Sequence, residues 1–455
     1  MKRIFLMVAL MLAAIVPQTG CKKTQLNSLT ETQEVFLKSG TAALAHTKQY
    51  KAEVATAWFH FLTELIRTRP YAPPPTARFF AYSGMALYES VVPGMPSYQS
   101  MYTYFTGNTI EVDKKKEYYW PATANAAMAG IISKLMLNYS ASANLAPVQQ
   151  LENQFNSQFQ LAVSAEQLQH SINFGKYVAE VIYNWSKTDG TLTQAGTLAA
   201  CPPYMPLGGP QNWVPTPPGL FPAAGGCQGS LRTFIPGVVA TTLPPPPPAY
   251  STVAGSVFYN MAAEVKQRVA NASADDLLIS QVWRDLLGTN YNTPAHLLKL
   301  SSQIIDVEGL DLEKAAEIYG KQGIANFDAV ASAFHAKFHY ALLRPVTYIR
   351  NAMGVPTWNS VYPTPQHPSY PAVAPGAAGS IVVILEKAFG THYAFSDSTQ
   401  KAIYGTFNYN SFNDLLKDVG RSRSHNGLNF QLSVDEGIKQ GRRVGEMISL
   451  LPFKK

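Results

Sequence analysis

Runs of apolar residues spaced three or four positions apart are the feature that most limits how this chain can fold. Early in the chain Val54, Trp58, Phe61, Leu62 and Leu65 recur with this spacing, which places them on one face of a helix. Similar or Ala-rich runs cover residues 79–90, 124–137, 165–185, 256–270, 312–343, 375–389 and 434–450. Segments with the two-residue alternation of half-buried strands are almost absent. The sequence therefore predicts an all-α fold.

The N-terminal region has the features of an export signal and not of a folded segment. Residues 1–20 combine a basic start with a short apolar stretch, which is typical of a signal peptide, and Cys21 follows a Thr-Gly pair as in a lipoprotein cleavage site. We expect Cys21 to carry lipid, residues 21–45 to form a flexible tether, and residues 46–455 to form a single domain. These features predict an outer-membrane or periplasmic lipoprotein of a bacterium, attached to the membrane through its lipid only.

A long irregular insertion is expected at about residues 186–250, where Pro and Gly are dense. Five consecutive prolines, 244–248, suggest a polyproline spacer. The two remaining cysteines, Cys201 and Cys227, lie inside this stretch, and in an exported chain we expect them to form a disulfide. A lone pair with this spacing is not a zinc pattern, and no metal ligand is predicted.

The charge balance gives little support for nucleic-acid binding. Lys and Arg number 36 against 29 Asp and Glu, so the formal net charge is +7, without a dense basic block. We expect no nucleic-acid partner. The oligomeric state is not indicated by the sequence.

Three separated segments carry the residues that point to chemistry. Lys337 and Arg344 are seven positions apart, which is two helical turns, and Pro345 follows. A segment beginning His367-Pro-Ser-Tyr-Pro comes next, and Ser422-Arg423 lies shortly before the last predicted helix. Their order and spacing resemble the three-part motif of the type-2 phosphatidic acid phosphatase and vanadium-dependent haloperoxidase superfamily, in its bacterial haloperoxidase-like lipoprotein branch. The resemblance implies a large helical bundle of that type, in which Lys337, Arg344 and Arg423 bind phosphate or vanadate oxygens.

The chain departs from the motif at the positions that perform catalysis in that family. The Ser-Gly-His triplet of the second motif falls on Ala372, Val373 and Ala374, and the final histidine of the third falls on Asn429. An alanine has no proton to donate to a leaving group, and a neutral amide neither attacks phosphorus readily nor binds vanadium as imidazole does. Both catalytic histidines of the motif are therefore expected to be missing.

Neighbouring residues are candidates to replace the missing histidines or to balance the charges of Lys337, Arg344 and Arg423. His425 is two residues from Arg423 and should face away from it on a helix, whereas His367 is expected to order its loop and to lie near the pocket. Asp285 is a pocket candidate that could neutralise the cations, and Asp328 is a second candidate for that role. The other histidines considered are His296, His335 and His339, which are expected to be structural or surface residues.

Three functions remain open from the sequence. The first is a pseudo-enzyme that keeps only weak oxyanion binding, with no cofactor expected but with phosphate, a phosphate ester or vanadate as a ligand. The second is an active phosphomonoesterase or vanadium-dependent haloperoxidase with a rearranged site. The third is a structural or surface lipoprotein whose insertion binds a glycan or a protein.

Overall fold

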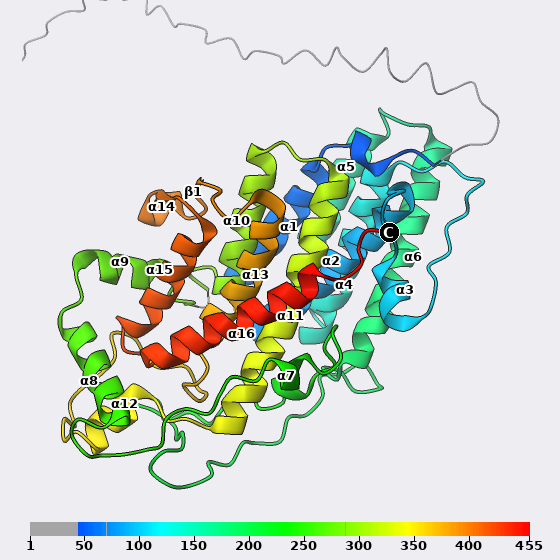
Figure 1. Ribbon diagram of the computed structural model, residues 1–455. Helices are drawn as coiled ribbons and strands as arrows, with labels where there is room; N and C mark the ends of the chain where they lie inside the picture. The colour runs from blue at the N-terminus through cyan, green and yellow to red at the C-terminus, as the bar shows by residue number, and fades with distance from the viewer. Residues whose placement is uncertain (1–43, 70, 287) are drawn as a thin grey trace, which may run out of the picture. The chain divides into compact units, whose positions relative to one another are not determined.

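Sixteen α-helices make up nearly all regular structure in the computed structural model, which describes residues 44–69, 71–286 and 288–455 (Figure 1). The α-helices are α1 (Glu53–Thr68), α2 (Pro73–Val91), α3 (Met101–Thr106), α4 (Trp120–Tyr139), α5 (Ala146–Phe159), α6 (Ala165–Ser186), α7 (Val238–Thr241), α8 (Val257–Ala270), α9 (Ala274–Val282), α10 (Thr293–Val307), α11 (Leu312–Tyr340), α12 (Pro345–Asn351), α13 (Val373–Phe389), α14 (Lys401–Tyr404), α15 (Phe412–Ser424) and α16 (Gln431–Ser449). Short 3-10 helices are η1 (Thr47–Gln49), η2 (Val92–Gly94), η3 (Lys187–Asp189) and η4 (Gln228–Ser230). The predicted all-α class is confirmed.

Strands play a minor part in the described residues. β1 (Phe395–Asp397) and β2 (Phe407–Tyr409) pair antiparallel, with Ser396 opposite Asn408. The two strands close a small excursion between α13 and α15. No described helix is both long and apolar enough to cross a membrane.

Eight of the sixteen described α-helices, including the longest, coincide with the ranges predicted from apolar spacing, and the differences have local causes. Helix α2 begins at Pro73, six residues before the predicted range, because proline lacks an amide hydrogen that the first helical turn would leave unpaired in any case. Helices α5, α9, α10 and α15 lie outside the predicted ranges. Three of them start at a side-chain cap, from Ser273, Asn292 and Ser411 respectively, which a search for apolar runs does not detect.

Helix α11 lies among the other long helices and carries Lys337, the first residue of the first motif (Figure 1). Its closest approach to α2 depends on glycine: a Cβ added to Gly323 would lie 2.4 Å from the carbonyl oxygen of Phe80, and one added to Gly84 would lie 2.5 Å from that of Tyr319. The two backbones therefore touch with no side chain between them. This contact fixes the position of α11 against the core.

Helices α13 and α16 also pack backbone to backbone, and this contact positions the second motif. Gly437, Gly441 and Gly445 recur every four residues on one face of α16. A Cβ at Gly437 would lie 2.4 Å from the carbonyl oxygen of Ala372, and one at Gly441 would lie 1.8 Å from that of Gly376. Any larger residue on this face would displace the beginning of α13.

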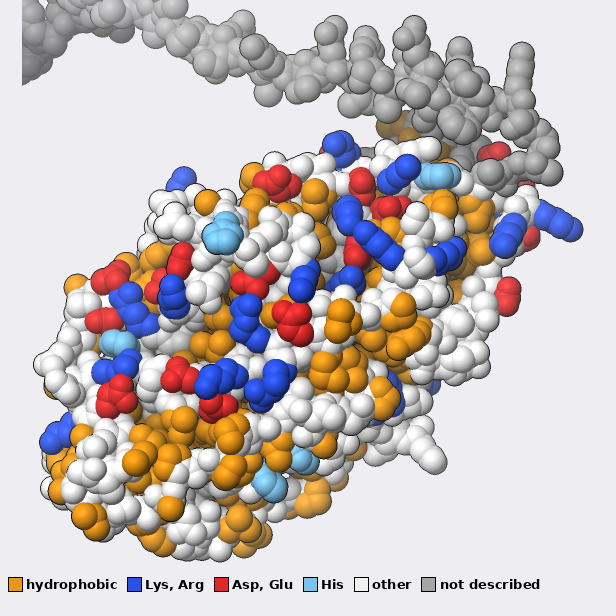
Figure 2. Space-filling view, in the orientation of Figure 1, with side chains coloured by type: hydrophobic (Ala, Val, Ile, Leu, Met, Phe, Trp, Pro, Cys, Tyr) orange, Lys and Arg blue, Asp and Glu red, His pale blue; other side chains and the backbone are white. Residues whose placement is uncertain are grey.

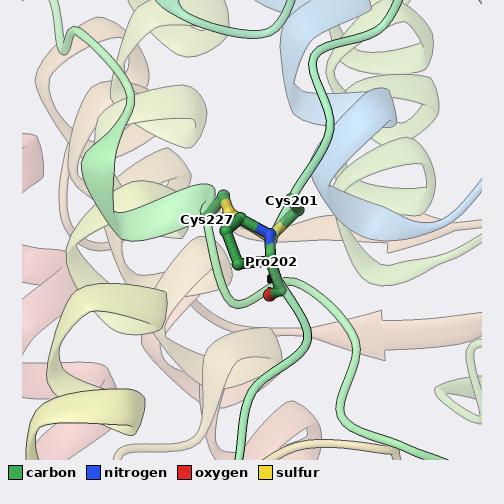
Figure 3. Close-up of a disulfide and its surroundings, with 3 residues drawn as sticks. All are labelled: Cys201, Pro202 and Cys227. Atoms are coloured by element: carbon green, nitrogen blue, oxygen red, sulfur yellow. Dashed lines mark hydrogen bonds between the residues drawn. A yellow bond between two sulfur atoms is a disulfide. The ribbon is translucent and has the colours of Figure 1, made fainter.

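The insertion at about 186–250 contains η3, η4 and α7 and is anchored at several points. Cys201 and Cys227 form a disulfide with a Cα–Cα distance of 5.7 Å (Figure 3). Asp328, on α11, accepts hydrogen bonds from the backbone amides of Phe234 at 2.8 Å and Ile235 at 2.9 Å. The carboxylate thus caps a turn of the insertion with a residue from the core.

The run of prolines at 244–248 is hydrogen-bonded to the helical part of the chain and is not the free spacer that the sequence suggested. The hydroxyl groups of Tyr340 and Tyr370 donate hydrogen bonds to the carbonyl oxygens of Pro244 and Pro245. Proline carbonyls remain good acceptors although proline lacks the amide donor. The run is therefore bonded directly to the two segments that carry the first and second motifs.

Apolar side chains are not evenly spread over the surface. Figure 2 shows them gathered toward the end of the molecule where Figure 1 shows α8, α12 and part of the insertion, while charged side chains of both signs are interspersed elsewhere on that face. Exposed large apolar residues of the insertion include Met205, Leu207, Leu220 and Phe221.

Candidate oxyanion site

Lys337 is buried near the C-terminal end of α11 and is directed at the second motif. The helix ends at Tyr340, and Ala341 adopts a left-handed conformation with φ of 48°. The expectation that Lys337 and Arg344 lie two turns apart on one helix is therefore wrong, because Arg344 lies beyond this break, in extended backbone before α12. The Nζ atom of Lys337 donates a hydrogen bond to the carbonyl oxygen of Pro368 at 2.7 Å and a longer one to that of Ser369 at 3.4 Å. Burial, together with the nearby Arg344 guanidinium, holds the pKa of Lys337 well below its ordinary value.

Arg344 immediately precedes α12 and joins all three motifs. Its Nε atom donates to the carbonyl oxygen of His367 at 2.9 Å, and its Nη1 atom donates to that of Leu428 at 2.9 Å. Its Nη2 atom contacts the carbonyl oxygen of Pro365 at 3.4 Å and the Nδ1 atom of His367 at 3.1 Å. Burial, with a contribution from Arg423, lowers the pKa of Arg344 to about 9, so this guanidinium still carries its charge at neutral pH.

Arg423 lies in the last turn of α15 and is paired with a carboxylate, which Lys337 and Arg344 are not within the described chain. Its Nη2 atom donates to Asp285, to the carbonyl oxygen of Trp283 and, at 3.3 Å, to the hydroxyl group of Thr293. Asp285 in turn accepts hydrogen bonds from the backbone amide and hydroxyl group of Thr293. The Nε atom of Arg423 is buried and has no hydrogen-bond partner among the described residues.

We refer to Lys337, Arg344 and Arg423 as the cation cluster. Lys337 and Arg344 both donate to the segment from His367 to Ser369. Arg344 also donates to the carbonyl oxygen of Leu428, whose amide donates to the carbonyl oxygen of Arg423, so the three residues lie close together. Among the described residues, Asp285 is the one carboxylate paired with a member of the cluster. Asp328, the second candidate for neutralisation, instead caps the insertion.

The second motif supplies backbone atoms to the site but no reactive side chain. Ala372 precedes α13, and its amide donates to the carbonyl oxygen of Ser433 at 2.7 Å. Val373 begins the helix, and Ala374 is nearly buried, with 8% of its surface exposed. None of these three side chains has a polar atom, so none can donate a proton or a hydrogen bond to a bound anion.

Asn429 reaches the same point in the structure from the third motif. Its side-chain amide nitrogen donates to the carbonyl oxygen of Ser369 at 2.8 Å. That carbonyl oxygen also faces Lys337. The amide therefore makes a structural hydrogen bond at the position that the motif spacing assigned to a histidine, and Ser369 contacts residues of the first and third motifs.

His367 lies inside the cation cluster, but both of its ring nitrogens are unsuited to attack. Arg344 can only donate, so the Nδ1 atom of His367 must accept the hydrogen bond between them. The proton of the neutral imidazole then resides on Nε2. Burial and the charges of Lys337 and Arg344 hold the pKa of His367 well below its ordinary value, which keeps the ring neutral.

The other histidines near the motifs are also engaged. His425 follows α15 and faces Asp276, with 3.7 Å between its Nε2 atom and a carboxylate oxygen, so it points away from the cluster as expected. His296 is buried and stacks on Trp283, with its Nε2 atom 2.7 Å from Asp397 and its Nδ1 atom 3.3 Å from the amide nitrogen of Gln400. These contacts are structural.

Sequence reasoning missed the residues that contribute through the backbone. The carbonyl groups of Pro365, His367, Pro368, Ser369 and Leu428 accept most of the hydrogen bonds of Lys337 and Arg344. Every residue type has a carbonyl group, so no sequence pattern marks these acceptors. Thr293 was missed as well, and its position after the Asn292 cap of α10 is the only local signal.

The donor set fits a charge-held oxyanion better than a vanadate bonded to imidazole. Among the described residues, three buried basic side chains face a single carboxylate, an arrangement that attracts an anion, and the unpartnered Nε atom of Arg423 offers a donor for it. No imidazole nitrogen of His367, His425 or His296 is available to coordinate vanadium. The residues at 374 and 429 supply neither a proton donor nor a nucleophile.

Comparison with known proteins identifies the fold. Residues 318–451 match the family model described as the VCPO second helical-bundle domain. No curated protein matches the chain. Among solved structures, a bacterial vanadium-dependent iodoperoxidase is similar with a TM-score of 0.79 and 24% identity, covering 88% of this chain and 96% of that one.

Two further structures, both of bacterial vanadium-dependent chloroperoxidase, are more distant. The apo form has a TM-score of 0.63 and 15% identity over 82% of this chain and 93% of that one. The holo form has a TM-score of 0.59 and 15% identity over 92% of this chain and 94% of that one. These similarities support the resemblance inferred from the motifs and show that the chain has the helical fold of the vanadium-dependent haloperoxidases.

Proposed function

We propose that this chain, on a vanadium haloperoxidase-like fold, is an exported pseudo-enzyme that has kept a weak oxyanion site and lost catalysis. The observation that carries the proposal is the imbalance of the cation cluster: within residues 44–69, 71–286 and 288–455, Arg423 has a carboxylate partner, whereas Lys337 and Arg344 have none. Burying such charges without a counter-ion is unfavourable, so an anion with several oxygens should bind there. Phosphate and vanadate have the required charge and acceptor atoms.

Weak binding follows from the same hydrogen bonds. Lys337 and Arg344 already donate to backbone carbonyl groups, so an entering anion replaces existing hydrogen bonds instead of completing unmade ones. Only the Nε atom of Arg423 among the buried cluster donors lacks a partner in the described chain. Electrostatic attraction therefore supplies most of the binding free energy, and affinity should fall with rising salt.

Loss of catalysis rests on the side chains at the motif positions. Phosphoryl transfer requires an in-line nucleophile and a proton donor in addition to charge neutralisation. Asn429 and Ala374 provide neither. Loss of a general acid alone typically costs a factor of about 10² to 10⁴ in rate.

The test is hydrolysis of p-nitrophenyl phosphate between pH 4 and pH 8 by the purified protein, beside Arg423→Ala. Arg421→Ala is a matched control, since Arg421 lies two residues away on α15 but pairs with Asp275 and Asp276 outside the cluster. We expect equal background in all three proteins. Turnover that disappears only in Arg423→Ala would contradict the proposal.

Oxyanion binding is tested separately by thermal unfolding with phosphate or vanadate. A ligand at about ten times its Kd adds about 1.4 kcal/mol, which for a chain of this size raises Tm by about 1 to 2 °C. We expect this shift in the parent protein and in Arg421→Ala, and its loss in Arg344→Ala and Arg423→Ala. No shift in the parent protein would leave a structural or surface-binding role.

Two alternatives have specific support. The cation cluster of Lys337, Arg344 and Arg423 is intact, which favours an active phosphomonoesterase or haloperoxidase with a rearranged site, and the hydrolysis test decides this case. The exposed apolar residues of the insertion, such as Leu207 and Phe221, favour a glycan- or protein-binding surface. That role becomes the leading one if neither turnover nor an anion shift is observed.

Export is part of the proposal. The predicted signal peptide and Cys21 lie outside the described residues, and support comes from the disulfide between Cys201 and Cys227, a bond that persists in oxidising compartments. Incorporation of labelled fatty acid into the protein in bacterial cells, and its loss in Cys21→Ser, is the expected result. Labelling that persists in the variant would show that the lipid is attached elsewhere or not specific.

A further inference from the structure

We propose that His335 and His339 form a surface binding site for a divalent transition-metal ion such as Zn²⁺, Ni²⁺ or Cu²⁺. The two residues are four positions apart on α11 and therefore lie on the same face of the helix, one turn apart. Their rings are nearly parallel, with an interplanar angle of 8° and centroids 6.3 Å apart. Paired imidazoles in this arrangement can chelate one ion, and these metals prefer imidazole nitrogen.

The ring nitrogens of this pair are available for a ligand. Within the described residues, neither His335 nor His339 takes part in a hydrogen bond or an ion pair, in contrast to His296, His367 and His425. His335 is partly buried and His339 is exposed. Binding of an ion by these two rings therefore does not require any existing hydrogen bond to break.

The backbone beneath the pair is held firmly by the insertion. A Cβ at Gly229, in η4, would lie 2.5 Å from the backbone nitrogen and Cα atoms of His335, so the turn rests directly on the helix. One residue beyond His339, the hydroxyl group of Tyr340 bonds to Pro244. Fixed ligands lose little freedom on binding, which favours chelation.

The proposed site supplies only two protein ligands, His335 and His339. The described residues contain no group of three or more His, Cys, Asp or Glu side chains placed to hold a metal, so water must complete the coordination. The pair lies in the last turns of α11, where the helix dipole favours a positive charge. A bound dication would stabilise this end of the helix, whose opposite face carries Lys337.

The experiment is thermal unfolding of the whole protein, prepared without a histidine tag, in phosphate-free buffer at pH 7.5 with Zn²⁺ or Ni²⁺ added, and with Mg²⁺ for comparison. We expect Zn²⁺ and Ni²⁺ to raise Tm and Mg²⁺ to have no effect, since Mg²⁺ prefers oxygen ligands. The shift should disappear in His335→Gln and in His339→Gln. The control His392→Gln alters an exposed histidine outside the pair and should keep the shift.

Direct binding gives a second readout that does not depend on stability. Titration with Cu²⁺ monitored by its ligand-field absorption should show one ion per chain at pH 7.5, with at least tenfold weaker binding in His339→Gln and loss of binding near pH 5, where imidazole is protonated. Unchanged Cu²⁺ binding in both histidine variants would overturn the proposal. Because His339 is exposed, its replacement should not prevent folding.

Discussion

Arg423 and Asp285 form an ion pair that balances one member of the cation cluster, whereas the other two have no carboxylate partner in the part of the chain that the structure describes. Asp285 therefore competes with any incoming oxyanion for the same guanidinium. Its own position is fixed by hydrogen bonds from Thr293, so it does not move away readily. The pair sets how strongly the cluster attracts an anion.

Removing this carboxylate should strengthen oxyanion binding while weakening the unliganded fold. In Asp285→Asn we expect phosphate to bind about tenfold more tightly, about 1.4 kcal/mol, because one negative charge next to the anion is lost. Without phosphate, the variant should lose about 3 kcal/mol of unfolding free energy, because a buried charge loses its partner. Calorimetric titration and urea unfolding measure the two effects. In the control Asp276→Asn, which removes a partner of Arg421, phosphate affinity should be unchanged.

His367 should prove to be a positioning residue and not a hidden nucleophile. In His367→Gln the background hydrolysis of p-nitrophenyl phosphate should be unchanged, because the imidazole has no lone pair available for attack. Unfolding free energy should fall by about 1 to 3 kcal/mol, since a buried hydrogen bond of Arg344 is lost or distorted. A drop in measurable turnover with an unchanged fold would show that His367 takes part in chemistry.

Reconstruction of the family motif tests whether the backbone of the site still suits catalysis. The combined replacements Ala372→Ser, Val373→Gly, Ala374→His and Asn429→His restore the polar atoms around the intact cation cluster. We expect phosphatase turnover at least 10²-fold above the parent protein, the effect of regaining an acid and a nucleophile. Neither Ala374→His nor Asn429→His alone should reach this level. If the full variant folds and stays inactive, the carbonyl hydrogen bonds of Lys337 and Arg344 keep anions out.

Asp328 should give the fold a pH dependence between about pH 4 and pH 7. Burial raises the pKa of Asp328 to about 7, although the amides of Ile235 and Phe234 favour its charged form. Since the folded state then binds a proton that the unfolded state releases above its ordinary pKa of 3.8, stability falls as pH rises through this window. Urea unfolding at pH 5 and pH 7 should therefore show higher stability at pH 5 from this group.

The variant Asp328→Asn separates this contribution from others. The pH slope should become smaller but not vanish, because burial also raises the pKa of Glu89 to about 7. Glu64 and Glu317 have pKa values lowered to about 2, so they lose stabilising charge only at lower pH, outside the window. An unchanged slope in Asp328→Asn would mean that the carboxylate is charged throughout.

The disulfide should stabilise the insertion measurably. Cys201 and Cys227 are 26 residues apart, and closing a loop of this length contributes about 3 to 4 kcal/mol in the chain-entropy model. The double variant Cys201→Ser with Cys227→Ser should unfold at lower urea concentration than the oxidised parent. Reducing agent should lower the stability of the parent toward that of the variant and leave the variant unchanged.

How much could be predicted differed between the fold and the site. Apolar spacing located the long helices because burial of one face is a local property of the sequence, and motif spacing located Lys337, Arg344 and Arg423. The pairing of Arg423 with Asp285 was anticipated only as one of two options, since Asp285 and Asp328 look alike in sequence. Their roles are decided by tertiary contacts: one meets a guanidinium and the other meets the amides of the insertion.

The anchoring of the proline run was not predicted, for a related reason. A run of five prolines indicates an extended backbone, but its partners, the hydroxyl groups of Tyr340 and Tyr370, come from distant positions in the chain. The central role of the Ser369 carbonyl oxygen was equally invisible. Backbone acceptors become specific only when the fold brings donors to them.

The carbonyl groups around Lys337 and Arg344 have a consequence for how the protein folds. Main-chain carbonyl groups already accept hydrogen bonds from Lys337 and Arg344, so the fold should not need a bound inorganic group in order to form. Folding should therefore proceed without vanadate, and an oxyanion that enters the site has to replace hydrogen bonds that already exist. The carbonyl groups of His367, Pro368 and Leu428 thus hold the side chains of Lys337 and Arg344 in position through the main chain.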